Sequence, residues 1–154
     1  MEKNFYSILF LTFSAIFIYG CVDNKTNKEE ADSVQTLVDE ISAVTEDVTA
    51  GAIEFITAMY NERSYEDDEF LERHCTPEML NKLKADCEYE GGGYATWDFR
   101  SGAQDGPNEQ NEIISVTPQN DNWYKYEFYD MGLKGSHEIR VTLTEGIYMI
   151  EDLK

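Results

Sequence analysis

The sequence predicts an α+β fold in which N-terminal helices precede an antiparallel meander. Up to about residue 86, apolar residues recur at intervals of three and four, which is typical of helices. After Gly91-Gly92-Gly93 they alternate in short runs separated by turn residues, which is typical of strands joined as hairpins. Because the helices come first and the strands follow at hairpin spacing, a βαβ repeat is excluded.

The chain begins with a predicted signal peptide, residues 1–20. An uncharged apolar run of about 15 residues, 5–19, follows Lys3 and is shorter than the roughly 20 residues that cross a bilayer. It ends in Ile18-Tyr19-Gly20-Cys21, which resembles a bacterial lipobox, so we expect Cys21 to receive a lipid and become the mature N-terminus. The alternative is an ordinary cysteine at the end of a membrane-anchor helix.

The next residues predict how the protein is held in the cell envelope. Residues 21–32 are polar and without periodicity, as expected of a flexible tether, and 33–154 form a single domain. Val22 stands where an Asp would favour retention in the inner membrane, so we expect an outer-membrane lipoprotein attached through its N-terminal lipid. Both locations of the domain, in the periplasm and on the cell surface, agree with these residues.

The formal charge of −19 limits the partners. Nucleic acid is excluded, because its binding depends on Lys and Arg that neutralise phosphates. A basic protein partner is favoured electrostatically, although an acidic surface also simply keeps an exported protein soluble.

Helix signals follow the tether in order. Apolar residues from Val34 to Tyr60 predict one amphipathic helix, with Gly51 as the place where it would kink or break. The acidic segment around Phe70 and Leu71 predicts one or two helical turns. Thr76 before Pro77 predicts a capped helix start.

Strand signals fill the rest of the chain. Alternation from Tyr94 to Arg100 predicts a strand with Trp97 on its buried face and Tyr94 and Asp98 outside. Four further strands are predicted at residues 112–117, 123–129, 137–144 and 147–150, with turns such as "PQNDN" and "TEG" between them.

Taken together, the "CTPEMLNKL" helix, the "YATWDFRSGAQDGP" segment and the closing meander resemble uncharacterised Bacteroidetes lipoproteins of the nuclear transport factor 2-like, or cystatin-like, superfamily. The resemblance spans roughly residues 50–154. It implies a cone in which a curved antiparallel sheet wraps helices around a pocket. This fold hosts enzymes, adaptors, toxin-immunity partners and binding modules, so the resemblance does not select a function.

Chemistry-bearing residues are few. Cys75 and Cys87 could form a disulfide, stay as buried free thiols, or react, and an intervening straight helix would hold them about 18 Å apart. His137 shares strand parity with Ile139 and Val141, which makes it the one weak catalytic candidate. No metal-ligand spacing or cofactor motif occurs, so neither a metal nor a cofactor is expected.

Aromatic residues supply the binding candidates. In "WYKYEFY" Trp123 and Tyr129 share one strand face, while Tyr124, Tyr126 and Phe128 share the other. If one row fills the core, Trp123 and Tyr129 are exposed for contact with a partner. The sequence therefore predicts a non-catalytic envelope protein that binds a small-molecule ligand or a protein. The alternatives are a periplasmic immunity or inhibitor protein and a small-molecule acid-base enzyme.

Overall fold

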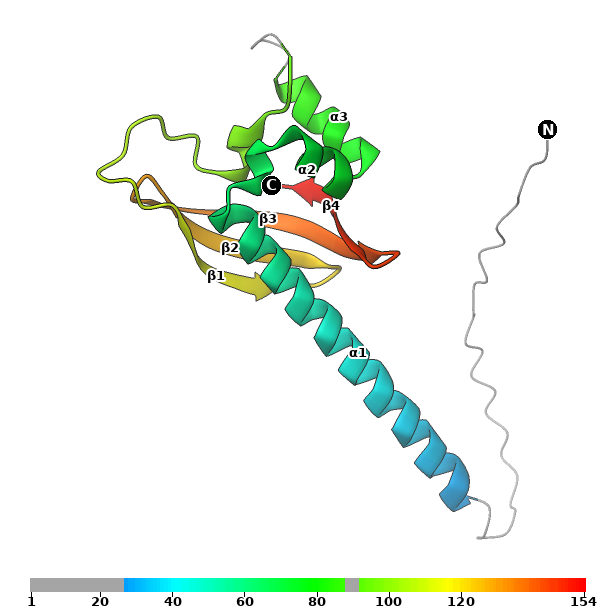
Figure 1. Cartoon of the computed structure of the whole chain (residues 1–154). Coiled ribbons are helices and arrows are strands. Elements are labelled where there is room, and N and C mark those ends of the chain that lie inside the picture. Colours follow the sequence, from blue (N-terminus) through cyan, green and yellow to red (C-terminus); the bar gives the residue numbers. More distant parts are fainter. Residues whose placement is uncertain (1–26, 88–91) are drawn as a thin grey trace, which may run out of the picture. The chain divides into compact units, whose positions relative to one another are not determined.

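The computed structural model describes residues 27–87 and 92–154 (Figure 1). Contacts within the chain divide it into two units, Met1–Leu37 and Val38–Lys154. The description below concerns the second unit, apart from the bounds of the helix that begins before it. The predicted signal peptide and residues 21–26 of the predicted tether, Cys21 among them, lie outside the described residues. The fold is α+β, with three helices followed by a four-stranded antiparallel sheet that packs against the first helix.

Helix α1, Asn27–Asn61, continues through Gly51, so the predicted kink or break there is wrong. A side chain at Gly51 would clash with the hydroxyl oxygen of Tyr148. The same hydroxyl donates a hydrogen bond to the carbonyl oxygen of Val48 (3.2 Å). Glycine is thus needed here for close approach of the helix to the sheet, and not for a change of direction.

Three short helical elements follow α1, and the cap of the third matches its sequence signal. The 3₁₀ helix η1, Ser64–Glu66, leads to α2, Asp68–His74, which is the predicted one or two turns. Helix α3, Pro77–Asp86, begins as predicted, with the Thr76 hydroxyl accepting a hydrogen bond from the Met79 amide (3.3 Å).

The predicted strand at residues 94–100 is wrong, because this segment forms the 3₁₀ helix η3, Thr96–Phe99. The backbone amide of Ala95 donates to the carbonyl of Leu83 in α3 instead of to a strand. Ala95 and Phe99 are fully buried, whereas Trp97 is 40% exposed and Tyr94 only 8%. The predicted placement of Trp97 in the core and Tyr94 outside is therefore reversed.

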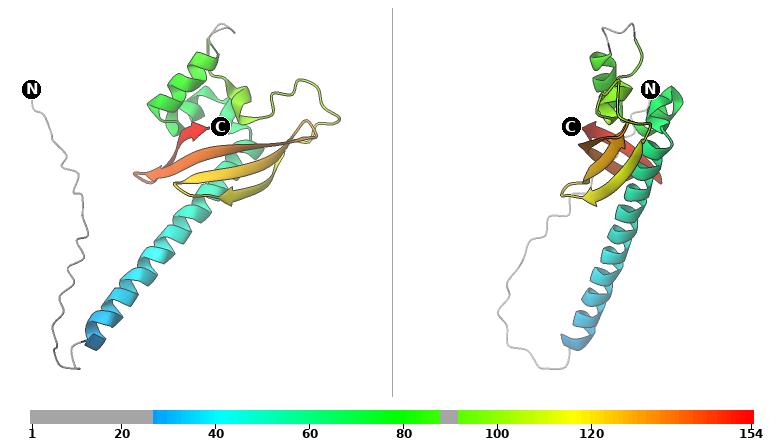
Figure 2. Two further views of the ribbon diagram at one scale, coloured as in Figure 1. Left: turned by 180° about the vertical axis from the view of Figure 1, so that it is seen from behind. Right: turned by 90° about the vertical axis from the view of Figure 1, so that its left-hand side faces the viewer.

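The sheet follows as a simple meander in the order β1-β2-β3-β4 (Figure 2). Its strands are β1 (Glu112–Pro118), β2 (Trp123–Asp130), β3 (Leu133–Thr144) and β4 (Ile147–Leu153). All pairs are antiparallel, with Tyr126 opposite His137 in the centre. The four strands predicted after residue 111 are confirmed, although β3 begins before the predicted His137.

The core lies between one face of this sheet and the helices. Tyr124, Tyr126 and Phe128 on the inner face of β2 are at most 4% exposed, as the alternation predicts. Tyr60 of α1 packs against Phe128 with ring centroids 4.8 Å apart. Its hydroxyl also donates to the carbonyl oxygen of Tyr129 (3.0 Å), which fixes the end of α1 on β2.

Cys75 and Cys87 are both free and buried, so the disulfide alternative is wrong. Helix α3 lies between them in sequence and keeps them at its opposite ends. Burial raises the pKa of the Cys75 thiol to about 12, which leaves it almost fully protonated and unreactive at neutral pH. Among the described helices, none is long and apolar enough to cross a membrane.

Candidate functional site

A cavity of about 340 Å³ opens beside Trp97, where residues far apart in the sequence meet. Its walls come from α3, from η3 with the loop that follows it, from β3 and from the end of β4. We call it the Trp97 cavity. Its lining residues are Lys82, Trp97, Asp98, Arg100, Ser101, Gly102, His137, Leu153 and Lys154.

Side chains of the sheet hold the segment that carries Trp97 by contacts with its main-chain carbonyls. The Tyr126 hydroxyl donates to the carbonyl oxygen of Phe99 (2.9 Å), and Nε2 of His137 lies 2.9 Å from the carbonyl oxygen of Arg100. Because Ala95 and Phe99 are buried on either side, the tight 3₁₀ turn directs Trp97 outward. The exposed indole therefore stands on a fixed backbone.

A fully buried carboxylate, Asp130 at the end of β2, fixes the next part of the same wall. Arg100 donates to it at 2.6 Å, and Ser101 donates through both its amide and its hydroxyl. Burial alone would raise the pKa of Asp130, but these hydrogen bonds and the Arg100 charge outweigh it and hold the pKa below its usual value. Asp130 is therefore ionised and structural.

The lining is basic although the chain is acidic. It contains three Lys or Arg side chains and one carboxylate, whereas the whole chain contains 12 Lys and Arg against 31 Asp and Glu. Each base has a partner in the fold: Lys82 pairs with Asp152 (2.8 Å), Arg100 with Asp130 (2.6 Å) and Lys154 with Glu138 (2.9 Å). The Lys82 ammonium group also donates to the Leu153 carbonyl oxygen and keeps its third donor for an anion, whereas the Lys154 ammonium group lies over the ring of Trp123.

Asp98 is the carboxylate in this lining. Burial raises its pKa, and the neighbouring carboxylate of Asp86 raises it further, while the charges of Lys82 and His137 act in the opposite direction.

His137, the weak catalytic candidate, lines this cavity but shows the contacts of a packed side chain. Its ring stacks on Phe128 with centroids 5.5 Å apart and lies 5.8 Å from that of Tyr126. Nε2 is engaged by the Arg100 carbonyl, and among the described residues no carboxylate is hydrogen-bonded to the ring. A proton carrier paired with a second titratable group is not assembled here.

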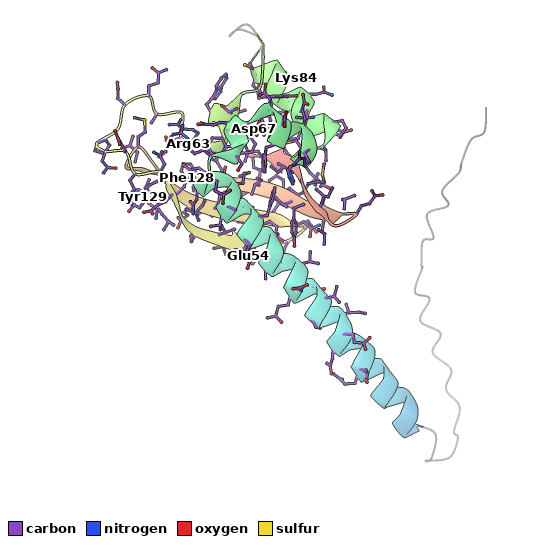
Figure 3. The ribbon with its side chains drawn as sticks, in the orientation of Figure 1. Glu54, Arg63, Asp67, Lys84, Phe128 and Tyr129 are labelled. Carbon is purple, nitrogen blue, oxygen red and sulfur yellow. The ribbon has the colours of Figure 1, made fainter. Side chains whose placement is uncertain are left out.

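Trp123 and Tyr129 lie on the outer face of the sheet, opposite to His137, and Figure 3 labels Tyr129 beside the inward-facing Phe128 on β2. Trp123 is partly covered, because Nζ of Lys154 lies 4.0 Å from its ring centroid and the Arg140 guanidinium 5.7 Å. The structure thus separates the predicted binding residues from the cavity. Their role in binding stays a prediction.

The Trp97 cavity was not predicted from the sequence. Trp97 was assigned to the core, and Lys82 and Lys154 carry no motif. The signal that could have found it is the spacing of the apolar residues Ala95 and Phe99. They are four residues apart, and a helical turn also places such residues on one side. In residues 27–87 and 92–154, no group of three or more His, Cys, Asp or Glu is arranged to hold a metal ion.

The fold and cavity define an α+β domain with a basic, partly aromatic cleft. No family model matches the sequence, and no curated protein matches it. Among solved structures, a protein of unknown function from Bacteroides thetaiotaomicron is similar, with a TM-score of 0.55 and 22% sequence identity. The similarity covers 79% of this chain and 98% of that chain, and at this identity it shows the fold alone.

Proposed function

We propose that the protein is a non-catalytic binding module of the cell envelope, and that its Trp97 cavity takes a small organic anion with a flat apolar part. The observation that carries the proposal is the basic lining around an exposed tryptophan in a chain of charge −19. An apolar ring can stack on Trp97, while a carboxylate or phosphate binds the ammonium group of Lys82.

Binding at this cavity can be read from Trp97 itself. Trp97 and Trp123 are the two tryptophans of the chain, so Trp123→Phe leaves Trp97 as the single indole reporter. We expect aromatic carboxylates or aryl phosphates to change its emission with saturation, and their uncharged amides or alcohols to have no effect. If none of the charged compounds changes the emission of Trp97, the proposal fails.

Charge removal at the cavity gives a matched test. Lys82→Gln should weaken binding of the anion at least fivefold, since Lys82 is the base of the lining that keeps a donor for it. The control is Lys134→Gln, which removes the same charge and also breaks an ion pair, but with Glu127 of the outer face. Equal weakening by both variants would show that only net charge matters.

The membrane attachment belongs to the same proposal. The short apolar run, the lipobox-like sequence and the polar residues after it support lipidation of Cys21 and anchoring at the outer membrane. Cys21→Ala should abolish labelling by a fatty-acid analogue and release the chain from membranes. Unchanged attachment would defeat the lipoprotein assignment.

A nuclear transport factor 2-like cone is the finer form of the fold that we propose. It is supported by the order of the elements and by the packing of α1 on one face of an antiparallel sheet. The acid-base enzyme alternative gains no support from His137, whose Nε2 is already engaged. The immunity or inhibitor alternative is favoured by residues 38–61, which contain five Asp or Glu and no Lys or Arg.

A further inference from the structure

Helix α1 carries apolar side chains that no part of its own domain covers. In residues 38–47, which we call the uncovered half, Val38, Ile41 and Val44 are 50%, 65% and 64% exposed. Their spacing of three places them on one side of the helix, and we call them the apolar stripe. In Figure 3 no other helix or strand of residues 38–154 lies beside this half.

The apolar stripe continues the face that α1 buries further along. In residues 48–61, the covered half, Ala52, Ile56 and Met59 are at most 1% exposed beneath the sheet. Helical spacing puts these residues on nearly the same side as Ile41. The same face is therefore core in one half and open in the other.

Charges beside the apolar stripe indicate what could cover it. Glu40 and Asp47 lie along one flank of the stripe, and the uncovered half contains no basic residue. Along the other flank lies the uncharged Ser42, and the uncharged Thr45 lies within the stripe itself. A complementary helix would have an apolar stripe of its own with Lys or Arg on the side that meets Glu40 and Asp47.

A second copy of this chain fits less well in either orientation. In an antiparallel pair, the flank with Glu40 and Asp47 would meet the same flank of the other copy, which is repulsive. In a parallel, in-register pair, the two helices would meet along this same face. From Ala52 onward the face is covered by each copy's own sheet, which would block the helix of the other copy. A basic partner avoids both costs.

We propose that the uncovered half of α1 is a docking site for a basic amphipathic helix of a partner protein. The helix lies against Val38, Ile41 and Val44 and sets its basic side chains opposite Glu40 and Asp47. This proposal does not depend on the Trp97 cavity, so either can fail alone.

The test uses a synthetic helical peptide with Leu at heptad core positions and Lys on its flanks. The full chain, held in phosphatidylcholine nanodiscs, is titrated with this peptide by calorimetry, and empty discs serve as the blank. A second peptide carries Glu in place of Lys. We expect saturable binding of the Lys peptide that weakens as salt is raised, and none of the Glu peptide.

Two pairs of variants locate the binding. The double variant Ile41→Ser/Val44→Ser should bind the Lys peptide more than tenfold more weakly. The control Ala43→Ser/Ala50→Ser changes exposed residues off the stripe and should alter the affinity by less than twofold. The double variant Glu40→Gln/Asp47→Asn should bind the Lys peptide at least threefold more weakly, and its affinity should depend less on salt. Asp39→Asn with Glu46→Gln removes the same charge from the far side and should matter less.

Three outcomes of the peptide titrations would overturn the proposal. They are failure of the Lys peptide to bind, equal binding of the Glu peptide, and unchanged binding by the Ile41 and Val44 variant. Dimers of the chain in sedimentation that disappear in the same variant would overturn it too, because a second copy would then be the occupant.

Discussion

The two halves of helix α1 carry apolar residues at the same spacing but have different surroundings. The covered half buries Ile56 and Met59 almost completely, whereas Ile41 in the uncovered half is 65% exposed. A helical period thus indicates which face of a helix is apolar, but not what lies against it. The covered half serves the folding of the domain, and the uncovered half is free to serve recognition.

The largest expected difference between the halves is in stability. Ile56→Ala removes a fully buried side chain and should lower the free energy of unfolding by about 4 kcal/mol. Ile41→Ala, the same change in the uncovered half, should alter it by less than about 0.5 kcal/mol. Denaturant unfolding of both variants measures the difference. Equal losses would mean that the uncovered half is buried in the native protein.

A second difference concerns how stability depends on pH in acid. Asp130 lies on the side that covers α1, and its lowered pKa means that its stabilisation is present above the unfolded-state pKa of about 3.9 and is lost as pH falls through the folded-state value. Asp130→Asn should lower the free energy of unfolding at pH 7 by about 3 kcal/mol and flatten its dependence on pH below 5.

The matched control is Glu46→Gln, which removes an exposed carboxylate from the uncovered half and should change stability by less than about 0.5 kcal/mol. Denaturant titrations between pH 3 and 7 compare the two. An acid-side slope that persists in Asp130→Asn would place the responsible carboxylate elsewhere.

The smallest expected effect lies at the junction of the halves. Helix propensity alone would make Gly51→Ala stabilising by about 1 kcal/mol. Since an added Cβ would meet the Tyr148 hydroxyl, we expect a net loss of about 1 kcal/mol. Removing that hydroxyl in Gly51→Ala/Tyr148→Phe should recover part of it. A stabilising Gly51→Ala in thermal unfolding would show that the helix and sheet are less closely packed.

Local signals made much of the fold predictable. Thr76 and Pro77 mark the start of α3 because the cap needs only neighbouring residues. The inner row of β2 follows from strict alternation, with Tyr126 buried and Lys125 exposed. These features depend on short-range geometry, which the order of residues contains.

Features that depend on distant partners were missed. The alternation from Ala95 to Phe99 is compatible with a strand, but the Ala95 amide bonds to Leu83 of α3, so a 3₁₀ turn forms. The sequence around Asp130 does not indicate its burial, which depends on Arg100, 30 positions away. The Trp97 cavity joins four elements and has no motif.

Amide hydrogen exchange along α1 tests most directly whether its halves have different roles. We predict that residues 48–61 exchange only by near-global opening, that residues 38–47 exchange much faster, and that the Lys peptide slows exchange in residues 38–47 alone. Protection of residues 38–47 equal to that of 48–61 without any peptide, or no change on adding it, would contradict the account.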